Sequence, residues 1–292
     1  MVNSMTERFY QFSAITVRIC AAKSQMYKDD GILSSFITKN KEFDYSLELQ
    51  MVEKVDPPEG ECVFCDSGLR VYRNGKKQIR YEGPVRENTD GAYLRVSREG
   101  MFGVAQLKRQ SHFERLTPKT VLNCIEAEHL ILQHSGFFLH ASFIDRNGKA
   151  VLFTAPSGTG KSTQAELWCQ LRGATQINGD RAAVRVASDG TVRADGVPYS
   201  GSSGICKNVS LPLEAVVYLT QSPETRLTPL FGVKAFQRIW EGCSVNTWNK
   251  EDVCSCSRTI MTMLTTVPVL HLACTPDESA VFALEQALEK LK

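Results

Sequence analysis

The fold of this 292-residue chain is decided by the stretch Ala155-Pro156-Ser157-Gly158-Thr159-Gly160-Lys161-Ser162-Thr163. It agrees with the pattern of a phosphate-binding loop at every position but the first, where Ala155 replaces the usual Gly. An apolar run that reads as a buried strand, 150–154, precedes it, and a helical pattern, 164–169, follows it. In that context backbone N–H groups and the positive end of the helix would cradle a polyphosphate. The alternative is a glycine-rich turn without a ligand.

Two side chains of this stretch carry specific chemistry in phosphate-binding loops. Lys161 would reach the β- and γ-phosphates, and the Ser162 hydroxyl would be a ligand of Mg²⁺. The sequence therefore predicts that residues 155–163 bind ATP together with Mg²⁺.

The composition excludes some classes of function but does not identify one. The net charge is +2, and 42% of the residues are hydrophobic, so neither a nucleic acid nor a membrane is expected as a partner. No run of about 18 apolar residues occurs, and residues 1–8 lack the apolar core of a signal peptide. Ten cysteines without such a signal favour free thiols and a cytoplasmic location.

The cysteines include a CxxC pair, Cys62 and Cys65, and a CxC pair, Cys254 and Cys256. Four thiolates could bind zinc, but the two pairs lie far apart in the sequence. The simpler interpretation is that the first pair enters a strand after the turn at 56–60.

Two domains are predicted. Residues 1–115 are β-rich, and their clearest signal is Asn74-Gly75 between two alternating segments, which indicates a hairpin. Residues 116–292 begin with a helical pattern at 117–134. A strand at 137–144 then turns through 145–148 into the strand that leads to the 155–163 loop. The fold class is α/β.

A candidate acidic residue follows the loop closely. Asn178-Gly179-Asp180 ends a short predicted strand, which would place Asp180 near the bound Mg²⁺ and γ-phosphate. A carboxylate there could hold the metal or take a proton from an attacking hydroxyl. The alternative is an ordinary turn. The small residues at 198–204 could likewise form either a flexible loop at the γ-phosphate or a simple turn.

These motifs together resemble the catalytic domain of HPr kinase/phosphorylase. The resemblance rests on His140-Ala141-Ser142-Phe143-Ile144, the hairpin, the 155–163 loop and Asn178-Gly179-Asp180. It is closer still to the HPr-kinase-like proteins of modified-peptide gene clusters, including lasso-peptide precursor kinases. The wider phosphoenolpyruvate carboxykinase superfamily shares the arrangement. The resemblance to HPr kinase/phosphorylase covers about residues 137–217. It implies a P-loop kinase domain that transfers the ATP γ-phosphoryl group to a serine.

The resemblance also implies roles for single residues. Lys161 would bind the β- and γ-phosphates, Ser162 and Asp180 the metal, and His140 would lie close to the phosphates. Asp180 would match the second acid of the family's Asp-Asp pair. Gly179 departs from the family because it stands where the first acid is usual.

The function expected is therefore an ATP- and Mg²⁺-dependent serine (or threonine) kinase acting on a peptide or small carrier protein. Two other interpretations stay open, namely a small-molecule alcohol kinase and a nucleotide-dependent switch with little catalysis. Homo-oligomer formation is also left open. One cation of two predicted helices, 233–248 and 252–264, would stabilise the transferring phosphoryl group, the candidates being Lys234, Arg238 and Arg258.

Overall fold

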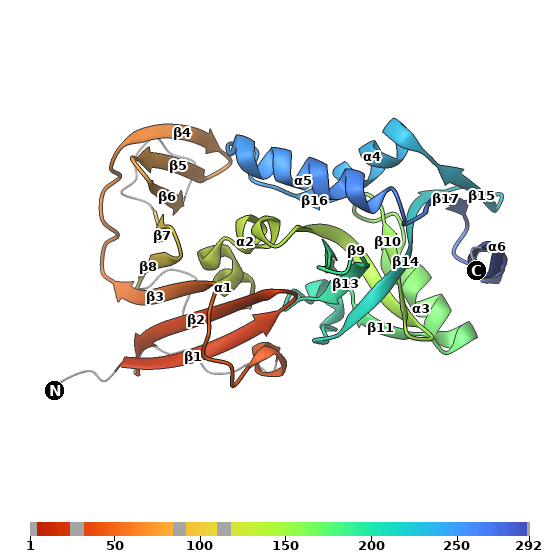
Figure 1. Cartoon of the computed structure of the whole chain (residues 1–292), viewed down its shortest axis with the longest axis horizontal. Coiled ribbons are helices and arrows are strands. Elements are labelled where there is room, and N and C mark those ends of the chain that lie inside the picture. Colours follow the sequence, from red (N-terminus) through yellow and green to blue (C-terminus); the bar gives the residue numbers. More distant parts are fainter. Residues whose placement is uncertain (1–4, 24–31, 84–91, 110–117, 291–292) are drawn as a thin grey trace. The chain divides into compact units, whose positions relative to one another are not determined.

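The computed structural model describes residues 5–23, 32–83, 92–109 and 118–290. The chain divides into two compact units, Met1–Ala127 and Glu128–Lys292. The boundary predicted between residues 115 and 116 lies outside the described residues. Each unit is built around one large sheet, and helices are few, so the chain is a mixed α/β protein (Figure 1).

The N-terminal unit is a sheet of eight strands in the order β1-β2-β3-β8-β7-β6-β5-β4. The predicted hairpin at Asn74-Gly75 is confirmed, since β5 and β6 pair antiparallel across it. Cys62 and Cys65 lie on the exposed strand β4. The strands are β1 (Met5–Phe12), β2 (Ile15–Ala22), β3 (Tyr45–Val52), β4 (Glu61–Asp66), β5 (Leu69–Asn74), β6 (Lys77–Glu82), β7 (Leu94–Glu99) and β8 (Phe102–Lys108), with a 3-10 turn η1 (Leu33–Phe36).

The helix predicted over 117–134 is instead two helices, α1 (Pro118–Ile125) and α2 (Ala127–Gln133). The break is at Glu126, whose φ of 52° is left-handed and cannot continue a right-handed helix. The Glu126 carboxylate is fully buried and accepts hydrogen bonds from Gln78 Nε2 (2.9 Å) and Arg98 Nε (3.0 Å). These charge-assisted bonds offset the strained backbone.

The C-terminal unit is a nine-stranded sheet whose main path runs β10-β9-β12-β13-β14-β17-β15. Its strands are β9 (Gly136–Arg146), β10 (Lys149–Thr154), β11 (Thr175–Asn178), β12 (Arg181–Val186), β13 (Val192–Gly196), β14 (Ser210–Gln221), β15 (Arg226–Leu230), β16 (Cys243–Ser244) and β17 (Val269–Cys274). Its other helices are α3 (Lys161–Arg172), α4 (Gly232–Trp240), α5 (Lys250–Met263) and α6 (Glu278–Lys290), with a 3-10 turn η3 (Gly201–Ser203).

Strand β10 lies between two different neighbours. On one side it pairs antiparallel with β9, through the hairpin that the sequence predicts, and on the other it runs parallel to β14. Strand β14 in turn runs parallel to β17. The carboxyl ends of β10, β14 and β17 therefore meet at one edge of the sheet, the edge at which α/β proteins bind ligands.

Helices α3 and α6 bury a common core against this parallel part of the sheet. Trp168 of α3 is fully buried there with Phe153 of β10, Val217 of β14, Leu272 of β17 and Leu284 of α6. Helix α4 is shorter than the predicted 233–248 helix, because the chain leaves it after Trp240 and pairs β16 with β9.

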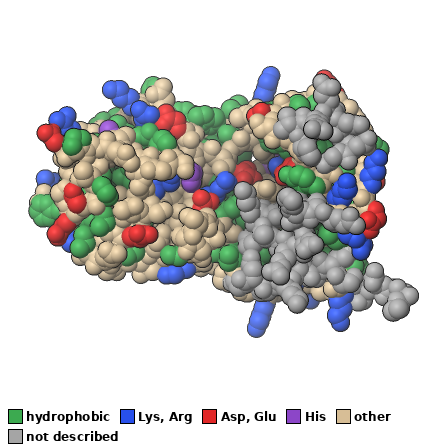
Figure 2. Space-filling view, turned by 180° about the vertical axis from the view of Figure 1, so that it is seen from behind, with side chains coloured by type: hydrophobic (Ala, Val, Ile, Leu, Met, Phe, Trp, Pro, Cys, Tyr) green, Lys and Arg blue, Asp and Glu red, His purple; other side chains and the backbone are tan. Residues whose placement is uncertain are grey.

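None of the helices among the described residues combines the length and apolarity needed to cross a bilayer. On the face seen in Figure 2, basic and acidic side chains are interspersed.

Removal of the Trp168 side chain tests whether this core holds α3. We expect Trp168→Ala to lower the free energy of unfolding by about 3–5 kcal/mol, because a large buried side chain leaves a cavity. Leu171→Ala on the same helix, at a 38% exposed position, should change it by less than about 0.5 kcal/mol. Urea denaturation of both variants measures the difference, and equal losses would contradict the assignment.

Candidate active site at the start of helix α3

The 155–163 loop joins the end of β10 to the start of α3, as the sequence predicts. Gly158 (φ 79°) and Gly160 (φ 117°) adopt left-handed conformations, which side chains rarely tolerate. Ala155, by contrast, has no positive φ and its methyl group packs into the core that contains Trp168. The departure from the loop pattern at position 155 is thus explained by packing.

Lys161 occupies the first turn of α3 and is only 8% exposed. Its Nζ donates to Ala155 O (2.9 Å) and Pro156 O (3.2 Å), so the ammonium lies inside the loop. Burial lowers the pKa of Lys161, while the negative charge of Asp180 acts in the opposite direction. A buried cation at the positive end of a helix is suited to an anion.

His140 lies on β9, one residue before the segment that pairs with β10. Its backbone is fixed at two points, because Thr154 Oγ1 donates to His140 O (2.9 Å) and His140 N donates to Gly242 O (2.8 Å). Burial lowers the pKa of His140, and the charge of Lys161 lowers it further. Both effects favour the neutral imidazole.

Asp180 lies in the turn between β11 and β12. One carboxylate oxygen is 3.6 Å from His140 Nε2 and the other is 3.6 Å from Arg181 Nε. The structure therefore brings Lys161, His140 and Asp180 together, although they come from α3, β9 and the β11–β12 turn. Together with Arg181 they form what we call the charged cluster.

Asn178 holds this turn in place. Its side chain is fully buried, and its Nδ2 donates to Val197 O (2.8 Å) and Tyr199 O (2.7 Å). Its Oδ1 accepts from the backbone N–H groups of Asp180 (2.8 Å) and Arg181 (3.0 Å). The Asn178 amide thus donates two hydrogen bonds and accepts two, which uses its full hydrogen-bonding capacity. Asn178 therefore fixes the position of Asp180 and is not a metal ligand.

Arg181 is a member of the cluster that the sequence analysis missed. Its guanidinium stacks over the Tyr199 ring (4.7 Å to the centroid) and donates to Ser244 Oγ (3.0 Å). It also faces Glu128 Oε1 at 3.4 Å. In the sequence, an arginine directly after Asp180 is only a weak indication of a functional residue. The partners that fix its guanidinium, Tyr199 and Ser244, are distant in the sequence.

The 198–204 loop packs against Asp180. Gly201 has a φ of +55°, and a Cβ added to it would lie 2.8 Å from the Asp180 Cβ. The loop that the sequence singled out therefore borders the charged cluster.

The three cations proposed from the predicted helices are placed differently. Arg238 stacks over Tyr218 and pairs with Glu241 at 2.9 Å, so its charge is already balanced. Lys234 and Arg258 are exposed on α4 and α5. Arg181, in contrast, faces Asp180 directly.

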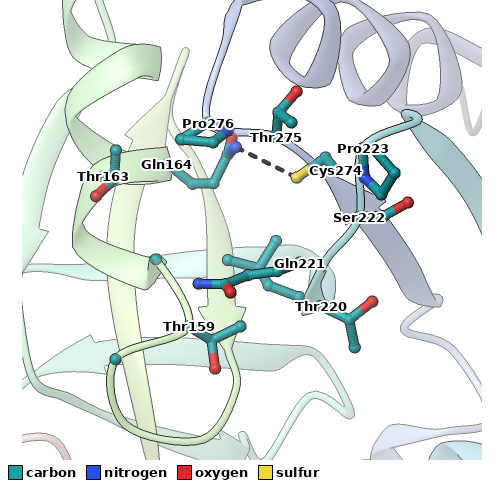
Figure 3. A pocket seen from close by; sticks show the side chains of 13 residues that line it. Thr159, Thr163, Gln164, Thr220, Gln221, Ser222, Pro223, Cys274, Thr275 and Pro276 are labelled. Atoms are coloured by element: carbon teal, nitrogen blue, oxygen red, sulfur yellow. Dashed lines mark hydrogen bonds between the residues drawn. The ribbon is translucent and has the colours of Figure 1, made fainter.

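The remaining residues of the loop are exposed or partly exposed. Ser162 and Thr163 are exposed in the first turn of α3, and Thr159 Oγ1 donates to Pro156 O (2.9 Å). A cavity of about 510 Å³ adjoins this side of the loop, between it and the ends of β14 and β17 (Figure 3).

The oxygen donors fit the sparse protein ligation that Mg²⁺ prefers. Among the described residues no three His, Cys, Asp or Glu side chains gather as a metal site. Mg²⁺, however, is held in phosphate-transfer sites by one or two protein oxygens together with phosphates and water. The exposed Ser162 hydroxyl and the Asp180 carboxylate could supply them. The two carboxylate oxygens lie 3.6 Å from His140 Nε2 and 3.6 Å from Arg181 Nε.

Gly179 has no room for a side chain. A Cβ added there would overlap Ser203 Oγ, which is itself fixed by donating to Ser200 O (2.8 Å). An acid at this position would require the 198–204 loop to move, so the absence of the first acid and the close approach of this loop are linked.

A double-mutant cycle tests that link. We expect Gly179→Ala to destabilise the protein by about 1–3 kcal/mol through overpacking. The same substitution in a Ser203→Gly background should cost markedly less, because the overlapping hydroxyl is gone. Thermal denaturation of the four proteins gives the coupling energy, and strictly additive effects would contradict the overlap.

The family model described as "SynChlorMet cassette protein ScmC" matches residues 114–276. No curated protein matches the chain. Among solved structures, the Hpr(Ser) kinase/phosphatase from Coxiella burnetii is similar at 12% identity and a TM-score of 0.30, over 52% of this chain and 88% of that one. Because the family model matches more than half of its residues, the chain belongs to the ScmC family.

Proposed function

We propose that this protein is an ATP- and Mg²⁺-dependent kinase that phosphorylates a serine or threonine hydroxyl of a peptide or small carrier protein. The observation that carries the proposal is the buried Lys161 in a glycine-containing strand–helix loop, beside Asp180 and His140. It is supported by the sequence resemblance to HPr-kinase-like proteins. The proposal includes the resemblance of this chain to the lasso-peptide precursor kinases among those proteins.

The phosphates of ATP would bind where the ammonium of Lys161 now contacts the loop carbonyls. The α3 N–H groups and Lys161 would hold the β- and γ-phosphates, and Ser162 and Asp180 would hold Mg²⁺. When bound, Mg²⁺ neutralises the charge that develops on the phosphate oxygens.

In the transfer step the acceptor hydroxyl oxygen forms a bond to the γ-phosphorus while the bond from that phosphorus to the β,γ-bridging oxygen breaks. The hydroxyl proton passes to the Asp180 carboxylate, and ADP is the leaving group. Neutral His140 is placed to hydrogen-bond either the carboxylate or the transferred group. Arg181 orients Asp180 and adds positive charge beside it.

The 198–204 loop borders the place where the acceptor must arrive. Its small residues let a peptide backbone come close to the γ-phosphate. A peptide acceptor is therefore preferred over a small-molecule alcohol, which remains an alternative.

A nucleotide-dependent switch is the second candidate, and Gly179 favours it. The first carboxylate of the Asp-Asp pair in the related kinases is missing at Gly179, and a side chain there would overlap Ser203. Such a protein would bind ATP with little phosphoryl transfer.

Phosphoryl transfer to a library of serine-containing peptides, read by mass spectrometry, tests the proposal. We expect the wild type to add one phosphoryl group to a subset of peptides. Lys161→Ala should lower this rate about 100-fold or more, and Asp180→Asn about 10²- to 10⁴-fold through loss of the base. Lys250→Ala, outside the site, should retain the wild-type rate. ATP binding with no transfer to any peptide would rule out the peptide kinase and favour a switch or a small-molecule acceptor.

The positioning role of Arg181 has its own test. Arg181→Gln should lower kcat between about 10- and 100-fold, because Asp180 loses its orientation. The Kd for ATP should stay unchanged, since Arg181 does not line the phosphate loop. Arg181→Lys should recover part of the rate, and Arg193→Gln on the neighbouring strand β13 is the matched control. A loss of ATP affinity equal to the loss of kcat would contradict a role through Asp180.

A further inference from the structure

Glu128, in the first turn of α2, takes no part in the chemistry described so far, yet it contacts two residues that lie beside Asp180. Its Oε1 accepts from Arg181 Nη1 at 3.4 Å and from the Tyr199 hydroxyl at 3.5 Å. The Glu128 side chain is 16% exposed, against 26% for Arg181 and 30% for Asp180. Of the two acids, Glu128 is therefore the one more shielded from water.

Arg181 lies between these two carboxylates. Its Nε is 3.6 Å from Asp180 Oδ2, and its Nη1 is 3.4 Å from Glu128 Oε1. One guanidinium charge thus faces two carboxylate charges, and water screens a partly buried pair less than an exposed one. Glu128 balances part of a positive charge that would otherwise act on Asp180.

Two neutral groups fix the guanidinium in this position. Arg181 Nη1 donates to Ser244 Oγ at 3.0 Å, and the guanidinium carbon lies 4.7 Å from the centroid of the Tyr199 ring. Ser244 belongs to β16, which pairs with β9, the strand that carries His140. These contacts hold the arginine in place without balancing its charge.

The residue next to Glu128 ties helix α2 to helix α5. His129 Nδ1 lies 2.7 Å from Asp252 Oδ1, and Asp252 Oδ2 accepts from Asn246 Nδ2 at 3.2 Å. Asp252 is buried in the first turn of α5. Glu128 is therefore carried by a helix turn that is itself fixed, which keeps its carboxylate against Arg181.

The distance between Asp180 and Arg181 fits an acid that must accept a proton. Charge-assisted N–H···O contacts are usually about 2.7–2.9 Å long, and on the same strand Arg185 Nε lies 2.6 Å from Asp195 Oδ2. A carboxylate held that tightly by a guanidinium is a weaker base, because the cation stabilises its charged form. At 3.6 Å, Asp180 is oriented by Arg181 without being locked to it.

We propose that Glu128 is a positioning residue for phosphoryl transfer. It holds Arg181 and balances part of its charge, so that Asp180 stays oriented and still accepts the proton of the acceptor hydroxyl. The inference rests on the proposed function, because it takes Asp180 as the proton acceptor. Glu128 acts through Arg181, which does not line the phosphate loop.

Steady-state transfer from Mg²⁺–ATP to a peptide that the wild type phosphorylates in the serine-containing library measures this role. Glu128→Gln keeps the side-chain shape and removes the charge. We expect kcat to fall about 5- to 30-fold, because Arg181 then pairs more closely with Asp180, while the Kd for ATP stays unchanged. Glu128→Asp should recover part of the rate. Glu289→Gln, exposed on α6, is the matched control and should retain the wild-type rate.

The same substitution in an Arg181→Gln background separates this role from a purely structural one. Without the guanidinium, Glu128→Gln should lower kcat further by less than about 2-fold, because the two residues act as one unit. Glu128→Ser is measured in both backgrounds as a second variant, with the same expectation, in case the amide disturbs the fold. Thermal denaturation checks that each protein is folded.

The outcomes separate this inference from the proposed function. Equal losses of kcat in the two backgrounds would overturn the inference, and so would a wild-type kcat for both Glu128→Gln and Glu128→Ser. Either result leaves the kinase assignment standing. If the folded wild type transfers no phosphoryl group to any peptide, the proposed function and the role of Glu128 are overturned together.

Discussion

The burial of Lys161 at the start of α3 is the constraint on which the site depends. An ammonium that is 8% exposed has lost most of its hydration, and it stands at the end of a helix that is itself positive. Two loop carbonyls compensate for this in the present structure. Burial lowers the pKa of this lysine, and the negative charge of Asp180 acts in the opposite direction. An anion is the natural partner for such an arrangement, and phosphate oxygens could replace both carbonyls.

The other residues of the site interact electrostatically with the Lys161 ammonium. The negative charge of Asp180 opposes the lowering of the pKa of Lys161 by burial, and the charge of Lys161 lowers the pKa of His140, so the three groups act on one another electrostatically. Asn178 fixes the turn that carries Asp180, and β9 fixes His140 next to the end of β10. The pairing of β9 with β10 thus places the His140 imidazole near Lys161. The buried Asn178 amide does the same for the Asp180 carboxylate.

The loop and its flanking strand and helix could be predicted because their signals are local. The glycines that adopt positive φ, the apolar run of β10 and the pattern of α3 are contiguous in the sequence. The β9–β10 hairpin was likewise marked by its own turn residues, Asn147 and Gly148.

What could not be predicted depends on contacts between distant residues. Glu126 breaks the predicted 117–134 helix because Gln78 and Arg98 reach its carboxylate. Arg181 joins the charged cluster because Tyr199 and Ser244 hold its guanidinium. The cavity has walls from three segments, and none of them carries a motif of its own. Such features arise only when the chain is folded.

We infer that a bound nucleotide replaces the loop carbonyls as the partner of Lys161. A crystal structure with Mg²⁺ and a non-hydrolysable ATP analogue tests it most directly. We expect β- and γ-phosphate oxygens within hydrogen-bond distance of Lys161 Nζ, with the γ-phosphate on the Asp180 side of the loop. An analogue bound elsewhere, or a Lys161 that keeps its bonds to Ala155 O and Pro156 O, would contradict it.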